Sequence, residues 1–264
     1  MTDRVTRSGP HPVKLRLLEV KRTADLTPHL RRITLGGDAL DGFTSLGADD
    51  HVKVFFPAPG ERQPILPTLG PNGPVLPEGV TPPARRDYTP RAYRPERSEL
   101  DLDFVLHGDG PGSTWAAQAR PGDLVGVGGP RSSTVVRYDF DWYLLLGDES
   151  ALPAIARRLE ELPAGVPVTV LLEVNDAHDE LPLTSAATVD VRWLHRAPHE
   201  PGTTTLLHDA LTNLPLPSGD GFVWGGTESN VAHTLREHLE GRSLAPHSFI
   251  RVTGYWKRGT AGPE

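Results

Sequence analysis

The sequence of 264 residues contains no cysteine. This absence excludes structural disulfides, thiolate metal sites, cysteine-ligated iron–sulfur clusters and a cysteine nucleophile. If the protein carries out redox chemistry, its electrons must pass through a bound organic cofactor or a substrate metal. The 11 histidines do not replace the missing thiols, because none of them falls in a convincing metal-ligand spacing. We therefore expect no resident metal site.

Long apolar runs and an excess of positive charge are also missing. No run approaches the ~18 residues that span a membrane, and the first residues lack the apolar region of a signal peptide. We therefore expect a cytoplasmic protein without a membrane span. A net charge of −7 argues against nucleic acid as a partner, because phosphate binding requires a basic face. Lysine is scarce, which makes each of its positions informative: Lys14, Lys21, Lys53 and Lys257.

Glycine and proline, with 27 residues each, are abundant. Such a composition is typical of many turns and loops, and not of a helical bundle. A chain of this length naturally forms two domains. We place them at residues 12–138 and 139–264, and we expect a monomer.

The first half contains short segments in which apolar and polar residues alternate, as they do in half-buried strands. These segments are residues 13–20, 29–37, 50–57, 100–107 and 123–130. Residues 57–84 carry nine prolines, so we expect a long loop without a regular element there. Many short strands with turns between them predict an antiparallel β-barrel of roughly 110–130 residues.

In the second half, apolar strands alternate with segments of helical periodicity. The expected strands are residues 142–147, 166–174, 188–194, 221–228 and 247–256, and the expected helices are 148–162, 205–214 and 229–239. This alternation predicts a parallel sheet of the doubly wound type. The predicted fold class is therefore a β-barrel followed by an α/β nucleotide-binding domain.

The stretch Arg85–Arg94 concentrates four arginines, two tyrosines and one threonine within ten residues. Guanidinium groups form forks for phosphate, phenol rings stack, and the hydroxyl binds heteroatoms. These groups suit a flavin dinucleotide. The alternative is a solvated arginine-rich loop.

A glycine-rich segment, residues 107–119, enters a predicted helix at about Ser113. Backbone N–H groups at a helix start form an anion site when glycines permit a close approach, and Ser113 or Thr114 would add a hydroxyl. Arg91 lies about twenty residues upstream across one predicted hairpin, so the two features could hold both halves of a pyrophosphate. The alternative is an ordinary capped helix.

In a doubly wound sheet, ligands bind at the carboxyl ends of the strands. Those ends carry our candidate contacts to a nicotinamide nucleotide: Gly147, Asp148, Glu149, Glu173 and Glu228. The G-x-G-x-x-G fingerprint is absent there. Glu173 would accept hydrogen bonds from an adenosine ribose, or it is an ordinary carboxylate at a strand end; both interpretations stay open.

The pattern Arg86-x-Tyr88-Thr89-x-Arg91 resembles the flavin motif of the siderophore-interacting proteins, a family of FAD-dependent ferric-siderophore reductases with a ferredoxin reductase-like plan. Further pieces occur in the family's order, from about residue 12 to the end of the chain. They are residues 51–57, the motif, 107–116, Gly122-Asp123, 129–131, 146–154, Trp224 with Glu228, and 254–259.

The resemblance implies an FAD site formed by Arg86, Tyr88, Thr89, Arg91, His107, Gly112, Ser113, Thr114, Tyr255 and Trp256. Tyr88 would flank the isoalloxazine ring, and Thr89 would hydrogen-bond the flavin. Arg91 would neutralise the pyrophosphate with help from the start of the helix. Arg86 would hold the flavin or its phosphate, and the His107 region would lie beside the phosphates or the adenine.

Three further aromatic residues have either a cofactor role or a packing role. Tyr255 and Trp256 would cover the other side of the ring, or they form a hydrophobic cover of the last strand. Trp115 would pack in the barrel wall.

The family also places cations beside the flavin to receive anionic ferric chelates, since a ferric triscatecholate carries three negative charges. The matching residues are Lys53, Arg131, Lys257 and Arg258. Lys53 is the leading candidate because it matches the lysine of the family's His-Val-Lys strand. The alternative is a solvated lysine on the outer face of a strand.

The implied activity moves electrons from NADH, NADPH or reduced ferredoxin through FAD to Fe(III) in a siderophore, and releases Fe(II). The identity of the siderophore and of the donor stays open. One departure from the family is Thr227, which precedes Glu228 where glycine is usual; a β-branched residue would narrow the nucleotide turn. The alternatives are a flavin or ferredoxin-type reductase with another acceptor, and a siderophore-binding protein without activity.

Overall fold

The computed structural model describes residues 4–70, 73–108 and 110–260. Its contacts divide the chain into two compact units, which we describe separately. The barrel unit comprises Arg7–Val135. The α/β unit comprises Val136–Glu264 together with the segment that ends at Thr6.

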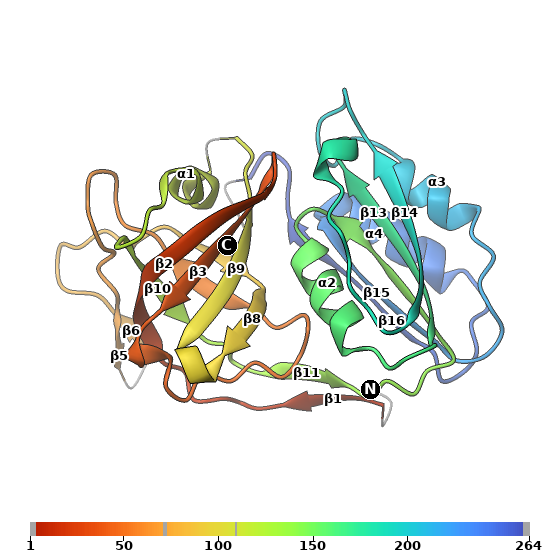
Figure 1. Cartoon of the computed structure of the whole chain (residues 1–264), viewed down its shortest axis with the longest axis horizontal. Helices are drawn as coiled ribbons and strands as arrows, with labels where there is room; N and C mark the ends of the chain where they lie inside the picture. The colour runs from red at the N-terminus through yellow and green to blue at the C-terminus, as the bar shows by residue number, and fades with distance from the viewer. Residues whose placement is uncertain (1–3, 71–72, 109, 261–264) are drawn as a thin grey trace. The chain divides into compact units, whose positions relative to one another are not determined.

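The barrel unit is built on a seven-stranded sheet in the order β7-β4-β10-β2-β3-β9-β8, with antiparallel pairing between neighbours (Figure 1). Its strands are β2 (Leu15–Thr27), β3 (Leu30–Gly36), β4 (Val52–Phe55), β7 (Arg85–Tyr88), β8 (Pro90–Arg94), β9 (Glu99–Val105) and β10 (Leu124–Gly128). The predicted antiparallel architecture is confirmed.

Strands β7 and β8 occupy opposite ends of this strand order, although only Thr89 separates them in the sequence. Consecutive Cα atoms lie about 3.8 Å apart, so the sheet must curl until its two edges meet at Thr89. We call this place the seam. The interpretation of Arg85–Arg94 as a loop is wrong, because β7 pairs with β4 and β8 pairs with β9, each at one end of the strand order.

Smaller elements complete the barrel unit: the 3-10 turns η1 (Asp38–Leu40) and η2 (Pro95–Arg97), the hairpin β5 (Thr68–Gly70) to β6 (Gly73–Val75), and the helix α1 (Pro111–Gln118). A two-stranded ribbon of β1 (Val5–Ser8) with β11 (Ser133–Val136) contains residues of both units. The expectation that residues 57–84 hold no regular element is wrong, since β5 and β6 pair there. Helix α1 begins two residues earlier than predicted because Pro111 suits the first helical position.

The core of the barrel unit consists of alternate residues from its strands. Its members include Leu18, Val20, Ile33, Leu35, Val52, Val54, Phe56, Leu100, Leu102, Phe104, Val125 and Val127, all at most 1% exposed. Burial of each such side chain contributes about 1.5–3 kcal/mol. This rigid core supports the seam from inside.

The α/β unit contains a five-stranded parallel sheet in the order β14-β13-β12-β15-β16 (Figure 1). Its strands are β12 (Trp142–Asp148), β13 (Pro167–Val174), β14 (Thr188–His195), β15 (Gly221–Glu228) and β16 (Phe249–Trp256). Its helices are α2 (Leu152–Glu161), the 3-10 turn η3 (Ala177–Asp179), α3 (Leu206–Thr212) and α4 (Ser229–Glu240). The predicted parallel sheet is confirmed.

Helices cover both faces of this sheet. Leu207 of α3 and Leu235 of α4 share a buried cluster with Val223 of β15. On the opposite face of β15, the guanidinium carbon of Arg158 in α2 lies 4.9 Å from the centre of the Phe222 ring. Because both faces are covered, every residue of β12 is buried, as its apolar sequence predicted.

None of the helices in the described parts of the chain is long and apolar enough to cross a membrane.

Candidate functional site

The motif lies at the seam, and β7 divides its residues between two faces. Arg85 and Asp87 are exposed, whereas Arg86 and Tyr88 are half-buried. The Tyr88 ring packs at a centroid distance of 4.2 Å on Phe104 of the core. Burial raises the pKa of the Tyr88 hydroxyl, and the charge of Arg86 opposes this rise only in part. The phenol is therefore neutral and acts as a packing surface.

Gly112 allows the first turn of α1 to approach Tyr88. A Cβ atom at position 112 would overlap the Tyr88 hydroxyl and lie 3.3 Å from Cζ of Phe56. Any side chain at position 112 would therefore force Tyr88 or Phe56 to move. Glycine at position 112 is thus needed to bring the helix start beside the tyrosine of the motif.

The first turn of α1 presents backbone donors. Its first intrahelical bond runs from Thr114 N to Gly110 O (2.9 Å), so the N–H groups of Gly112 and Ser113 precede the helical ladder. Ser113 Oγ accepts a bond from His107 N (2.8 Å) and is buried, whereas Thr114 is exposed. The structure therefore separates the two predicted hydroxyls: Ser113 ties the preceding loop, and Thr114 is open to solvent.

Arg91 is the extra residue of a β-bulge, which the sequence did not reveal. Pro90 pairs with Leu102 and Ala92 with Asp101, so β8 advances by two residues while β9 advances by one. A bulge redirects a side chain and increases the local twist. The bulge therefore gives half-buried Arg91 its direction at the seam, next to Thr89, which is 7% exposed.

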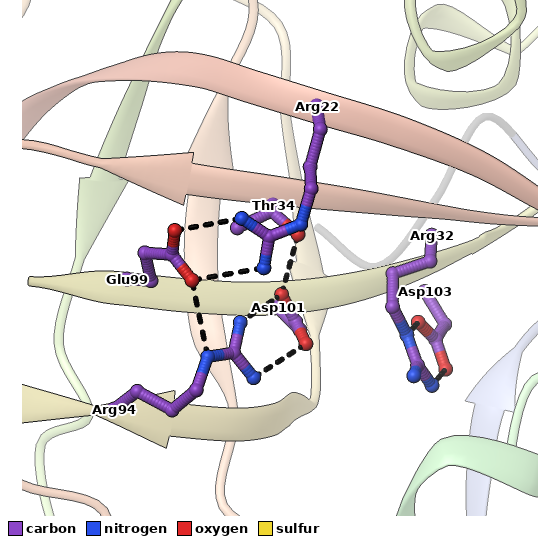
Figure 2. A network of polar contacts seen from close by, with 7 residues as sticks. All are labelled: Arg22, Arg32, Thr34, Arg94, Glu99, Asp101 and Asp103. Carbon is purple, nitrogen blue, oxygen red and sulfur yellow. Dashed lines mark hydrogen bonds and ion pairs between the residues drawn. The ribbon is translucent and has the colours of Figure 1, made fainter. Parts of the chain in front are cut away.

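Arg94, for which the sequence indicated no role, belongs to a network that joins β2, β3, β8 and β9 (Figure 2). Its guanidinium forks onto Asp101 at 2.7 and 2.8 Å and donates to Glu99 at 3.1 Å. Arg22 forks onto Glu99 at 2.6 and 2.8 Å, and Thr34 donates to Asp101 at 2.6 Å. The bonds from Arg22 and Arg94 lower the pKa of Glu99 to about 2. Arg94 is thus a structural cation that holds β8 beside its bulge.

Two further contacts in this region are structural. Arg32 forks onto Asp103 at 2.7 and 2.8 Å and joins β3 to β9 (Figure 2). The Tyr93 hydroxyl donates to Leu40 O at 3.1 Å, and its ring lies 4.9 Å from that of Phe43.

Trp115 packs against the core cluster of the barrel unit, in agreement with the prediction that it lies in the barrel wall.

Lys53 lies on the outer face of β4, opposite Asp87 on β7. Its Nζ is 2.8 and 3.1 Å from the two carboxylate oxygens of Asp87. The Lys53 side chain is 47% exposed, as its predicted role requires, but its acidic partner was not anticipated. Arg131, which follows β10, is also exposed.

The predicted carboxylates of the α/β unit gather at one edge of its sheet, where Asp148 and Glu173 are register partners. Asp148 is 6% exposed and accepts four bonds. The donors are Ser150 N (2.9 Å), Ser150 Oγ (2.5 Å), Thr227 Oγ1 (2.8 Å) and Trp256 Nε1 (2.8 Å). Asp148 therefore joins the loop after β12 to the ends of β15 and β16 through these bonds.

The expectation of a nucleotide turn at Thr227 is wrong, because this residue lies inside β15. Its backbone is paired with Gly254 of β16, and its hydroxyl binds Asp148. A β-branched residue is favourable in such a paired strand.

The glycine at position 147 is required by packing. A Cβ atom at this position would lie 2.7 Å from the Cβ atom of Ala151 and would overlap the carbonyl oxygen of Gly226.

Glu149 forms a buried ion pair with Arg196, at 2.5 Å from Oε1 to Nη1, and the same oxygen accepts a bond from Asn175 N at 3.1 Å. Burial raises the pKa of Glu149 to about 7; the charge of Asp148 adds to this rise, and Arg196 opposes it. Burial likewise raises the pKa of Glu173, whose Oε2 accepts a bond from Thr204 Oγ1 at 2.7 Å.

Glu228 caps helix α4. Its Oε2 accepts bonds from Asn230 N (2.6 Å) and Val231 N (3.2 Å), and Oε1 accepts one from Arg258 N (3.2 Å). A carboxylate at a helix start satisfies free N–H groups and suits the helix dipole. Each of the four predicted carboxylates thus has structural partners, and a nucleotide role for them stays a prediction.

Tyr255 and Trp256 cover the carboxyl edge of their own sheet. The Tyr255 ring meets that of Trp224 edge-on at 6.0 Å and lies 2.9 Å from where a Cβ of Gly226 would be. Trp256 binds Asp148 through its indole N–H. Their place over a flavin stays a prediction, as does substrate binding by Lys257 and Arg258, which are exposed.

A serine, a histidine and an aspartate meet in the barrel unit, but their geometry is structural. Ser133 Oγ donates to Asp50 at 2.6 Å and lies 3.0 Å from His11 Nε2. In a catalytic triad the carboxylate binds the histidine and the serine is accessible. Here Asp50 binds the serine, and Ser133 is 1% exposed.

The described residues also contain no group of three or more acidic or histidine side chains that could hold a metal ion.

Two family models match the chain, one for each half. Residues 19–134 match the siderophore-interacting FAD-binding domain, and residues 140–259 match the siderophore-interacting protein model. Both models agree with the motif resemblance found in the sequence.

Individual proteins match over nearly the full chain. The NADPH-dependent ferric-chelate reductase of Escherichia coli is 38% identical, over 97% of this chain and 98% of that protein. The ferric vibriobactin reductase ViuB of Vibrio cholerae is 35% identical, over 98% and 93%. The crystal structure of a siderophore utilization protein from T. fusca superposes with a TM-score of 0.91 at 40% identity, covering 98% of this chain and 99% of that one.

Proposed function

The chain belongs to the siderophore-interacting protein family, and on this premise we propose that it is an FAD-dependent reductase of ferric siderophores. It takes electrons from a reduced nicotinamide nucleotide and delivers them to chelated Fe(III). The observation that carries this proposal is the seam, where β7, the bulge of β8 and the start of α1 gather the motif. Two relatives of similar length are named as ferric-chelate and ferric vibriobactin reductases.

The residues at the seam suit FAD in both shape and charge. Gly112 keeps the space beside Tyr88 free of a side chain. The N–H groups of Gly112 and Ser113 and the guanidinium groups of Arg86 and Arg91 are donors suited to a pyrophosphate. The neutral Tyr88 ring, held by Phe104, suits an aromatic ring system.

In this proposal each group at the seam has one task. Arg91 and the first turn of α1 hold the pyrophosphate, Tyr88 supports the ring, and Thr89 donates or accepts a hydrogen bond with the flavin. Arg86 binds the flavin or its phosphate. The ties from Ser113 to His107 and from Arg94 to Asp101 keep these groups in place.

Bound FAD would supply the redox chemistry, accepting two electrons from one nicotinamide and giving one electron to each of two ferric ions. The iron needs no protein ligand because the siderophore provides its coordination sphere. Oxygen chelators bind Fe(II) far more weakly than Fe(III), so reduction releases the metal. The protein contributes positions and charge.

Exposed cations would attract an anionic ferric chelate. Lys53 and Arg131 would do so on the outer face of the barrel, where both side chains reach solvent. Lys257 and Arg258 would serve the same purpose from the end of the chain.

The carboxyl edge of the α/β unit would receive the electron donor. Glu173 would bind the adenosine ribose, and Gly147, Asp148, Glu149 and Glu228 would shape the edge. The name of the Escherichia coli relative favours NADPH, with NADH and reduced ferredoxin as the other donors to be tested. We also propose that the enzyme acts as a cytoplasmic monomer, since released iron is used in that compartment.

The test is a titration of the purified protein with ferric chelates and with NADH, NADPH or reduced ferredoxin. We expect a yellow protein, with flavin absorbance near 450 nm, that accelerates iron reduction by at least one chelate. Turnover with ferredoxin or quinones but with no chelate would overturn the siderophore assignment. A colourless protein that takes up no FAD would instead indicate a binding protein without activity.

A further inference from the structure

The ion pair between Lys53 and Asp87 lies in a row of residues that crosses three strands. Asp87 of β7 pairs in register with Lys53 of β4, and Lys53 pairs with Gly128 of β10. Residues in register on adjacent strands point to the same face. Apolar atoms of Leu15 and Phe55 fill the space that a Cβ of Gly128 would enter, so position 128 adds no charge to the row.

Positive charges flank this aspartate on β7 and β4. Arg85 lies two residues before Asp87 on the exposed face of β7, and Lys53 is its register partner on β4. Asp87 therefore subtracts one charge from a face that otherwise carries the cations Arg85 and Lys53.

The pair is exposed enough to exchange partners. The Lys53 and Asp87 side chains are 47% and 31% exposed. Ion pairs of this exposure contribute little to stability, so a docked anion can compete with the carboxylate for the lysine. Asp87 would then stand beside the anion with its own charge uncompensated.

We propose that Asp87 is a specificity-determining residue that sets how much negative charge this face accepts in a ferric chelate. The inference rests on the proposed function. A ferric triscatecholate has a charge of −3, because three catecholate dianions surround Fe(III), whereas a ferric trihydroxamate of three monoanions is neutral. Asp87 repels the first and competes with it for Lys53, but it has little effect on the second. Asp87 thereby lowers the preference of this face for a strongly anionic chelate over a neutral one.

The experiment compares the FAD-loaded wild type with the variants Asp87→Asn and Asp87→Ser. The probes are a hexadentate triscatecholate and an uncharged hexadentate trihydroxamate, each loaded with Ga(III) for binding and with Fe(III) for reduction. Ga(III) has the charge of Fe(III) but is not reduced, so quenching of tryptophan fluorescence measures binding independently of turnover. Asp25→Asn is the matched control, since Asp25 is an exposed carboxylate that pairs with Arg31 (3.5 Å) in the same unit.

At low salt, we expect both Asp87 variants to bind the Ga(III) triscatecholate about three- to tenfold more tightly, and the trihydroxamate less than about twofold more tightly. The ratio of kcat/KM for the two Fe(III) chelates should move by the same factor, and about 0.5 M salt should remove most of the difference. Asp25→Asn should leave both affinities unchanged.

Equal effects on both chelates, or weaker binding of the triscatecholate, would overturn the role of Asp87. Failure of the proposed function has a different signature, because the wild type would then reduce neither Fe(III) chelate. Binding of the Ga(III) chelates would in that case still report on Asp87.

Discussion

The two units of this protein use charged residues in opposite ways. At the seam of the barrel unit, the candidate cations Arg86 and Arg91 are half-buried, and Lys53 on the outer face is largely exposed. At the carboxyl edge of the α/β unit, the candidate carboxylates are at most 6% exposed and accept bonds from protein donors. The candidate charges of the barrel unit are therefore at least partly open to solvent, whereas those of the α/β unit are buried in bonds within the fold.

The pKa values show the same contrast. In the barrel unit, bonds from Arg22 and Arg94 lower the pKa of Glu99 to about 2, so the folded state favours the ionised form. In the α/β unit, burial raises the pKa of Glu149 to about 7, so the folded state favours the protonated form. Glu99 thus loses its stabilising contribution as the pH falls from about 4.5 toward 2, whereas Glu149 loses its contribution as the pH rises from about 4.5 toward 7.

The largest expected effect is that of a charge reversal at Arg91 on FAD binding. Arg91→Glu replaces a cation suited to the pyrophosphate by an anion that repels it, so we expect FAD to bind at least about 100-fold more weakly. The measurements are the ratio of absorbance at 450 nm to that at 280 nm after purification, and a fluorescence titration with FAD. Arg97→Glu, an exposed change in η2 of the same hairpin, should retain FAD. Equal retention by both variants would contradict the pyrophosphate role of Arg91.

The shape of the seam is tested by Gly112→Ala. The new methyl group would collide with the Tyr88 hydroxyl, and overpacking of this kind costs about 1–3 kcal/mol of unfolding free energy. Tyr88→Phe in the same chain should restore part of the loss, as urea denaturation would show. Gly110→Ala is the control, because a Cβ at position 110 meets nothing within 4 Å. A loss of equal size in the control would contradict the role of Gly112.

For the α/β edge, Glu149→Gln should flatten the dependence of stability on pH. Between about pH 4.5 and 7, folded Glu149 retains a proton that the unfolded chain releases, so wild-type stability falls as the pH rises. The slope attributable to this one group is at most about 1.4 kcal/mol per pH unit. Urea midpoints measured across this pH range give the slope for each variant. Glu240→Gln, an exposed change at the end of α4, should keep the wild-type slope, and an unchanged slope in Glu149→Gln would refute the assignment.

The smallest effect concerns substrate charge. Lys53→Ala should spare the flavin and raise KM for an anionic ferric chelate about fivefold, because one exposed cation is removed from the docking face. Steady-state kinetics of Fe(II) release measure this change. Lys21→Ala removes a lysine of similar exposure that pairs with Glu19 on the same unit, and it should leave KM unchanged. Unchanged chelate kinetics in Lys53→Ala would refute the substrate site.

Much of the fold follows from local patterns. Alternation in residues 100–107 and the apolar run 142–147 placed β9 and β12 to within two residues, because burial on one face or on two leaves a periodic trace in the sequence. The β5–β6 hairpin was missed because proline-rich segments lack that trace. The strands at Arg85–Arg94 were missed because polar edge strands resemble loops in composition.

The residues of the candidate site were likewise predictable from the sequence only in part. The motif identified Arg86, Tyr88, Thr89 and Arg91 through their chemistry, and the family models support the family to which that motif points. The bulge at Arg91 and the fork of Arg94 onto Asp101 depend on pairing between strands, which residue identity alone does not specify.

The sequence by itself determined the family, the two-part architecture and the residue types available for a flavin, because these depend on composition, periodicity and a short motif. Only the tertiary structure decided which charges are open and which are used internally. Lys53 meets Asp87, and Asp148 meets Thr227 and Trp256, across separations of 34 to 108 residues. Such contacts arise when the sheets close, and they set how much charge each unit leaves open to solvent.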